Sequence, residues 1–179
     1  MKKTMFVSIL TVVATSLLVP AAAFAHATLE QPTATAGSFY KAVMRIGHGC
    51  EGGAATQTVR IQIPDGVKQA KPMPKAGWKL ETVVKKLDKP YDWYGQTITE
   101  DVSEIVWSGG YLPDNFYDEF VFRAKLPDEA DQTLYFKTIQ ECEEGVHRWI
   151  EIPEPGKTAD DYEEPAPGLK LIKQEAHSQ

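Results

Sequence analysis

The chain has 179 residues and a formal net charge of −6 at neutral pH. Residues 1–25 contain two lysines and no acidic residue, so the 154 residues that follow carry a net charge near −8. A chain of this length is the size of one domain, and its acidity argues against binding to nucleic acid or to anionic lipid.

The first 25 residues have the three parts of a secretory signal peptide in the required order. Lys2 and Lys3 supply the positive start, residues 6–18 form an apolar run, and Ala23 and Ala25 occupy the positions that a signal peptidase needs. The alternative is a membrane anchor, but the apolar run is shorter than the about 20 residues that span a bilayer. We therefore predict a cleaved signal over residues 1–25 and export to the periplasm or cell envelope.

Cleavage after Ala25 leaves His26 as the first residue of the mature chain. The freed α-amine and the imidazole of the same residue can close one chelate ring on a metal ion. An internal histidine cannot do this, because its backbone nitrogen belongs to an amide. We predict that His26 is a metal ligand; the alternative is a chain terminus without a role.

The residues after His26 alternate between apolar and polar, which indicates β-strands with one solvated face. Phe39–Ile46 places Tyr40, Ala42, Met44 and Ile46 on one face, and residues 57–63 place Val59, Ile61 and Ile63 on one face. Further strands are predicted at residues 28–30, 79–86, 102–108, 116–124, 133–139 and 146–152.

Turn signals rich in proline and glycine separate these short strands, and no segment has the caps and period of a helix. The spacing favours two packed antiparallel sheets. The predicted fold is therefore all-β, an antiparallel immunoglobulin/fibronectin-like β-sandwich over residues 26–153. No further apolar run is long enough to predict a membrane span in the mature chain.

Residues 154–179 differ in composition, because prolines and acidic residues replace the alternating pattern. Such a composition does not supply a hydrophobic core. We predict an extended C-terminal strap or a partly disordered tail, in which Leu169, Leu171 and Ile172 could dock as a final short strand.

Two cysteines, Cys50 and Cys142, are present. Export to an oxidising compartment favours a disulfide between them, and closing so long a loop is worth about 4–5 kcal/mol in the chain-entropy model. The alternative is a thiolate metal site that uses Cys50 beside His48 and Glu51.

A disulfide would bring the segment that contains His48 and Glu51 close to the segment that contains Trp149, and His26 need only fold back to join them. Two nitrogens from His26 and one carboxylate from Glu51 make a mixed nitrogen and oxygen site. Such ligands suit Cu(II), which heads the affinity order of the first-row divalent ions, and zinc is the competitor.

Two residues of this group have alternative interpretations. His48 is either an additional nitrogen ligand or a loop histidine that bonds the backbone. Alternation places Trp149 on the same face as His147 and Glu151, which favours a wall beside the metal, although a plain core tryptophan is the alternative.

The order of motifs along nearly the whole mature chain resembles the YcnI-like family of exported copper-binding domains. The motifs that carry the resemblance are His26-Ala27-Thr28-Leu29-Glu30, Ala36-Gly37-Ser38, His48-Gly49-Cys50-Glu51-Gly52, Lys71-Pro72-Met73-Pro74 with Gly77-Trp78, Trp107-Ser108-Gly109-Gly110, Tyr117-Asp118-Glu119-Phe120, Gln140-Glu141-Cys142, Arg148-Trp149-Ile150-Glu151-Ile152-Pro153 and Glu164-Pro165-Ala166-Pro167-Gly168.

The resemblance implies a β-sandwich that binds one Cu(II) per mature chain through a single-histidine brace. It assigns the amine and imidazole to His26, the carboxylate to Glu51 and a tryptophan beside the metal to Trp149. It further implies copper handling in the envelope by a chaperone or carrier that is not an enzyme, with an envelope copper-transport or copper-delivery protein as its partner.

Three rival functions remain open. A copper-dependent oxygenase with an N-terminal histidine brace needs a second histidine, which His48 or His147 could supply. A metal-free interaction sandwich needs only the β pattern, since fold does not imply function. A blue-copper electron carrier needs a free cysteine ligand.

Overall fold

The computed structural model describes residues 26–174; the predicted signal peptide, residues 1–25, and the last five residues lie outside the described residues. The elements in chain order are β1 (Thr28–Leu29), β2 (Thr33–Thr35), β3 (Phe39–Ile46), the 3-10 turn η1 (Glu51–Gly53), β4 (Thr56–Gln62), β5 (Lys68–Pro72), β6 (Lys79–Trp93), β7 (Gln96–Leu112), β8 (Asp118–Lys125), β9 (Thr133–Tyr135), β10 (Thr138–Cys142), β11 (Val146–Trp149), the 3-10 turn η2 (Ala159–Asp161) and β12 (Gly168–Ile172).

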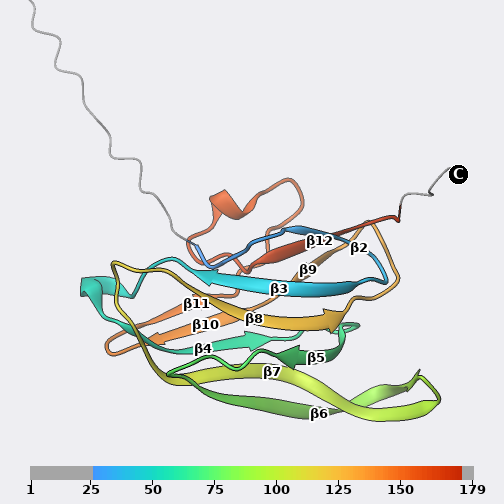
Figure 1. The fold of residues 1–179 in the computed structure, drawn as a ribbon. Helices are drawn as coiled ribbons and strands as arrows, with labels where there is room; N and C mark the ends of the chain where they lie inside the picture. Colours follow the sequence, from blue (N-terminus) through green and yellow to red (C-terminus); the bar gives the residue numbers. More distant parts are fainter. Residues whose placement is uncertain (1–25, 175–179) are drawn as a thin grey trace, which may run out of the picture.

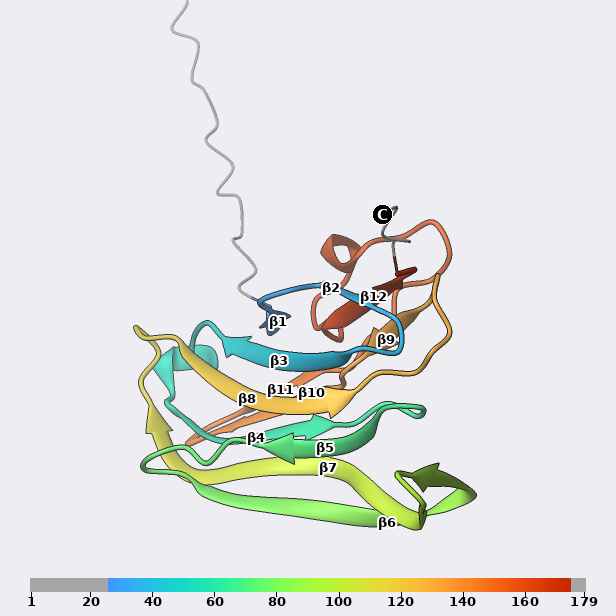
Figure 2. The same cartoon turned by 45° about the vertical axis from the view of Figure 1, so that its right-hand side comes forward.

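The strands form two large sheets and one small one. The four-stranded sheet has the order β1-β3-β8-β5, the five-stranded sheet β11-β10-β4-β7-β6, and the three-stranded sheet β2-β12-β9. Figures 1 and 2 show the small sheet on the far side of β3 from β8, with β6 and β7 at the opposite end of the molecule. This arrangement confirms the predicted all-β sandwich with two antiparallel sheets; in the small sheet, β12 pairs with β9 antiparallel and with β2 parallel.

The core lies between the two large sheets and is built from the faces that alternation predicted. Ala42, Met44 and Ile46 of β3 and Val59 and Ile61 of β4 are all at most 1% exposed. They pack with buried aromatic side chains of β7, β8 and the β9–β10 connection, namely Trp107, Phe120, Phe122 and Phe136. Burying each such side chain contributes about 1.5–3 kcal/mol, so these strands have a strongly preferred register.

The long hairpin of β6 and β7 differs from the sequence prediction. The strand predicted at residues 79–86 is longer in the structure, because β6 continues through Lys89 and Pro90 to Trp93, with a register shift between Lys86 and Tyr91. Since β6 is an edge strand, a proline there removes no essential ladder hydrogen bond. The turn itself lies at Tyr94 and Gly95, whose φ values are 52° and 81°.

The predicted strand at residues 133–139 is two strands that belong to different sheets. β9 pairs with β12, whereas β10 pairs with β4 and β11. The chain crosses between the sheets at Phe136, whose fully buried side chain packs in the core. Strands β2 and β5 were not predicted, because they are short and lack a clear alternation.

The segment after β11 is a strap that returns to the sandwich. Ile150 and Glu151 donate backbone hydrogen bonds to the carbonyl of Glu164, and β12 then inserts between β2 and β9. Leu169 and Leu171 are fully buried, whereas Ile172 is 42% exposed. The predicted docking of a final short strand is therefore confirmed, and the hydrophobic core extends past residue 153, where the sandwich was predicted to end. Within residues 26–174, no helix is long and apolar enough to cross a membrane.

Cys50 and Cys142 form a disulfide with a Cα–Cα distance of 6.0 Å. It joins the loop after β3 to the end of β10, across 92 residues of sequence. The pairing confirms the disulfide prediction and removes the alternative in which Cys50 is a thiolate ligand. It also removes the free cysteine that a blue-copper site would need.

We expect replacement of both Cys50 and Cys142 by serine to lower the free energy of unfolding by about 2–5 kcal/mol, because the unfolded chain regains the freedom of the long loop. Urea unfolding of the parent and variant under non-reducing conditions measures this difference. Equal midpoints and slopes for the two proteins would contradict the expected stabilisation.

The hydroxyl of Tyr40 links β3 to the β1–β2 connection. It donates a hydrogen bond of 2.7 Å to the carbonyl of Gln31. Burial, and to a smaller extent the charge of Glu30, raises the pKa of Tyr40 to about 12. The folded protein therefore holds this proton more tightly than the unfolded chain does, and stability falls as the pH rises from about 10 toward 12.

We expect Tyr40→Phe to lower stability by about 1 kcal/mol at neutral pH through loss of this hydrogen bond. The same variant should lose less stability than the parent between about pH 10 and 12, because one titrating group is gone. Thermal unfolding at several pH values tests both effects, with the exposed Tyr111→Phe as the matched control. A parallel alkaline decline in the parent and in Tyr40→Phe would contradict the expectation.

Candidate functional site

Trp149 is the centre of a cluster of histidine rings. Its side chain is 3% exposed and belongs to the hydrophobic core. The ring centroids of His26, His48 and His147 lie 5.9, 6.3 and 4.8 Å from the Trp149 ring. Three of the four histidines in the sequence therefore surround one buried indole.

The position of Trp149 follows from its place on β11. Alternation turns His147 and Trp149 toward the interior, while Val146 and Ile150 are 40% and 38% exposed. The sequence prediction that Trp149 shares its face with His147 is therefore confirmed. Trp149 is also a core residue, as the alternative interpretation expected, and its role as a wall beside a metal stays a prediction.

Gln140 of β10 connects the indole to the loop that follows β3. The Nε1 atom of Trp149 donates to Gln140 Oε1 at 3.1 Å. The Nε2 atom of Gln140 donates to the carbonyl of His48 at 2.7 Å and to Thr56 Oγ1 at 2.8 Å. Gln140 is 1% exposed, so these bonds are shielded from water and hold the loop in place.

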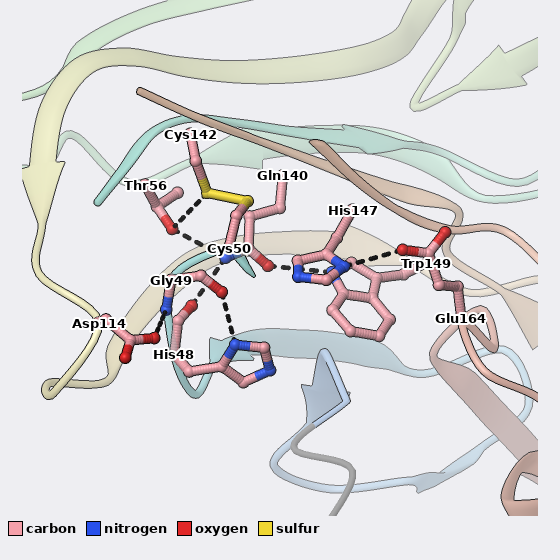
Figure 3. Close-up of a disulfide and its surroundings, with 10 residues drawn as sticks. All are labelled: His48, Gly49, Cys50, Thr56, Asp114, Gln140, Cys142, His147, Trp149 and Glu164. Atoms are coloured by element: carbon pink, nitrogen blue, oxygen red, sulfur yellow. Dashed lines mark hydrogen bonds and ion pairs between the residues drawn. A yellow bond between two sulfur atoms is a disulfide. The ribbon is translucent and has the colours of Figure 1, made fainter. Parts of the chain in front are cut away.

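The loop from Gly49 to Gly53 has little freedom. The amide of Gly49 donates to Asp114 Oδ1 at 2.9 Å, and the amide of Cys50 donates to the carbonyl of Ala54 at 2.9 Å. A Cβ atom at Gly49 would lie 2.2 Å from the Ala54 carbonyl oxygen, so only glycine fits there. The disulfide fixes the other side of this loop, as Figure 3 shows.

His48 donates a hydrogen bond from Nδ1 to the carbonyl of Gly49 at 2.5 Å. A carbonyl oxygen can only accept, so Nδ1 carries the proton and Nε2 of the neutral ring carries a lone pair. The structure thus confirms that His48 is a loop histidine whose side chain bonds the backbone. It leaves Nε2 chemically suited to bind a metal.

His147 is held in the same manner by an acidic residue of the strap. Its Nδ1 atom bonds Glu164 Oε1 at 2.8 Å, and Glu164 Oε2 accepts from the amide of Arg148 at 3.1 Å. The ring of His147 stacks on Trp149 with an interplanar angle of 26°. Sequence reasoning named His147 only as a ligand of the oxygenase alternative and did not identify Glu164 as its partner.

Glu51 begins the 3-10 turn directly after Cys50 and is exposed. It lines a pocket of about 280 Å³ together with Cys50, Gly145, Val146, His147 and Glu164. The structure therefore places Glu51 at the same end of the sandwich as the histidine cluster and on the side of His147. Its predicted role as a ligand beside His26 remains a prediction.

The donors at this end of the molecule are imidazoles and carboxylates. Among residues 26–174, no group of three or more histidine, cysteine, aspartate or glutamate side chains is arranged to hold a metal ion. The predicted His26 chelate draws a second nitrogen from the α-amine, which exists only after cleavage. Imidazole and amine nitrogens with a carboxylate fit copper and zinc.

Three comparisons with known proteins bear on the identity of the chain. No curated protein matches it. A crystal structure of an uncharacterized protein from Nocardia farcinica, described as having an immunoglobulin-like fold, is similar with a TM-score of 0.62 and 23% identity. The similarity covers 82% of this chain and 98% of that one, and it shows the fold.

The model of a protein family, described as a domain of unknown function (DUF1775), matches residues 26–171. The match begins at His26 and reaches into β12, so it includes every residue of the histidine cluster. The chain therefore belongs to the DUF1775 family, which is the YcnI-like family that its motifs resemble.

Proposed function

We propose that the mature chain is an exported copper-binding protein that holds one Cu(II) through the amine and imidazole of His26. The carboxylate of Glu51 completes the protein ligands, and Trp149 lies beside the metal. The protein acts as a carrier or chaperone that exchanges copper with a copper-transport or copper-delivery protein of the envelope. No reaction is assigned to it.

The observation that carries this proposal is the position of His26. Its ring meets the buried indole of Trp149 edge-on, with a centroid distance of 5.9 Å and an interplanar angle of 60°. Chain ends fray unless other contacts hold them, and the buried Ala27 and strand β1 hold His26 against this indole. The family match that begins at the same residue also supports a domain that starts with His26.

Glu51 supports the proposal because the disulfide ties its loop to the sheet that carries Trp149. It follows Cys50, which the disulfide joins to β10, and β10 pairs with the strand that carries Trp149. Gly52 and Gly53 have φ values of 73° and 79°, which allow the tight turn that exposes the Glu51 side chain. An exposed carboxylate at this place lowers the electrostatic cost of holding a divalent cation.

A carrier function is favoured over a structural metal site because the site is partly open. His26, His48 and His147 are only partly buried, so a partner protein can approach an ion held there. Ligand exchange between two proteins requires such access, whereas a structural metal is usually enclosed by four protein ligands.

Copper binding should depend on removal of residues 1–25, because only cleavage frees the His26 amine. We expect a chain that retains residues 21–25 to bind Cu(II) at least tenfold more weakly than the mature chain. Competition titration with a chromophoric chelator measures both affinities. The proposal is wrong if the extended chain binds its first Cu(II) as tightly as the mature chain does.

The carboxylate can be tested separately. We expect Glu51→Gln in the mature chain to weaken Cu(II) binding severalfold and to change the spin-resonance spectrum of the bound ion, because a charged oxygen donor becomes a neutral one. Glu129→Gln, an exposed residue outside this cluster, is the matched control and should change neither property. Identical spectra for Glu51→Gln and the parent would remove Glu51 from the ligand set.

Acid should weaken binding to the mature chain, because the metal and protons compete for the same nitrogen atoms. We expect the apparent Cu(II) affinity to fall steadily from pH 7 to pH 5 in the same competition assay. An affinity that does not change over this range would contradict nitrogen ligation by His26.

A further inference from the structure

The cluster contains a pair of imidazoles that the His26 chelate does not use. His48 belongs to the loop after β3 and His147 to β11, yet their ring centroids lie 5.5 Å apart at an interplanar angle of 84°. Figure 3 shows both rings beside the indole of Trp149. Segments far apart in the sequence thus bring two imidazole rings together beside one indole.

Both rings are held in the tautomer that a metal requires. His48 Nδ1 donates to the Gly49 carbonyl, and His147 Nδ1 faces a carboxylate oxygen of Glu164. Each Nδ1 therefore carries the proton, and each Nε2 carries the lone pair. Histidines that bind metals typically use their other ring nitrogen in this way, with a carboxylate or a backbone carbonyl as the acceptor.

The separation of the rings suits a shared ion. A metal–nitrogen bond of about 2.0–2.1 Å places each ring centroid about 3 Å from the metal, so two imidazoles on one ion have centroids roughly 4.5–6 Å apart. The observed 5.5 Å lies within this range. The carbonyl of Gly49 holds the ring of His48. The carboxylate of Glu164 and the stacked indole of Trp149 hold the ring of His147.

The surroundings favour a cation. Glu51 and Glu164 line the pocket of about 280 Å³ that His147 also lines. The neighbouring cation on β11, Arg148, is exposed on the opposite face of the strand from His147 and Trp149. This pocket lies on the His147 side of the pair, carries two carboxylates, and admits solvent water that can complete the coordination of an ion.

We propose that His48 and His147 form a second site for a first-row divalent cation, with Cu(II) preferred, separate from the chelate of His26. Glu164 is the positioning residue that orients His147. Water supplies the remaining ligands, because the described residues offer no third protein donor arranged around this pair. Because it has only two protein ligands, the second site binds an ion more weakly than the chelate does. Weak binding suits an ion that is being transferred to or from a partner protein.

The test uses the folded chain that retains residues 21–25, in which the His26 amine is blocked. Titration with Cu(II) should reveal one remaining weak equivalent, and Zn(II) should compete for it. His147→Ala and His48→Ala should each weaken this equivalent at least tenfold. Glu164→Gln should weaken it by about 10- to 100-fold, as loss of an orienting carboxylate does at other histidine sites.

Controls separate this site from the chelate and from misfolding. His177→Ala should leave the affinity of the weak equivalent unchanged. His147→Gln keeps a polar side chain opposite Glu164, so it should fold like the parent and still bind this equivalent of Cu(II) at least tenfold more weakly. Absence of the weak equivalent, or its persistence in both His48→Ala and His147→Ala, would overturn the second site. Failure of the chelate appears instead as equal first affinities of mature and extended chains, so the two outcomes are distinguishable.

Discussion

The carboxamide of Gln140 couples the two halves of the candidate site. One end accepts from the indole of Trp149, and the other donates to the carbonyl of His48 and to Thr56. The group is buried, so removal of either partner would leave a polar atom unsatisfied at a cost of about 1–3 kcal/mol. The positions of the indole and of the His48 loop are therefore linked, and the disulfide of Cys50 adds a covalent link to the same strand.

This coupling shows how a plain β-sandwich can hold the residues of the candidate site together at one end. The two sheets supply rigidity through ordinary apolar packing, and that packing includes Trp149 itself. The histidines are then placed on the edge of the core, where their rings contact the indole and are only partly buried. The strap contributes as well, because Glu164 both pairs with the backbone of β11 and orients His147. At least one acidic residue of the strap thus has a specific structural role.

Much of the fold could be predicted from alternation and from the positions of proline and glycine. The inward faces of β3 and β4 were predicted correctly because apolar and polar residues alternate along most of each strand, with buried Val43 as the exception in β3. The predicted end of β6 was wrong because an edge strand tolerates a proline, here Pro90, and can continue past it. The single strand predicted at residues 133–139 was wrong because its alternating residues belong to two strands of different sheets, on either side of Phe136. For the site, alternation alone placed His147 beside Trp149, and the cysteine pair brought His48 near them. The bond between His147 and Glu164 had no local signal, since it depends on how the strap returns to the sandwich.

The central claim is that the ion is held by the amine and the imidazole of one residue. The most direct measurement is pulsed hyperfine spectroscopy of the mature chain loaded with one equivalent of Cu(II), comparing protein with natural nitrogen and protein in which histidine alone carries ¹⁵N. The account predicts coupling to two directly bonded nitrogen atoms, both of which change on histidine labelling, with one having the coupling of an amine. Coupling to imidazole nitrogen alone, without a bonded amine, would contradict it.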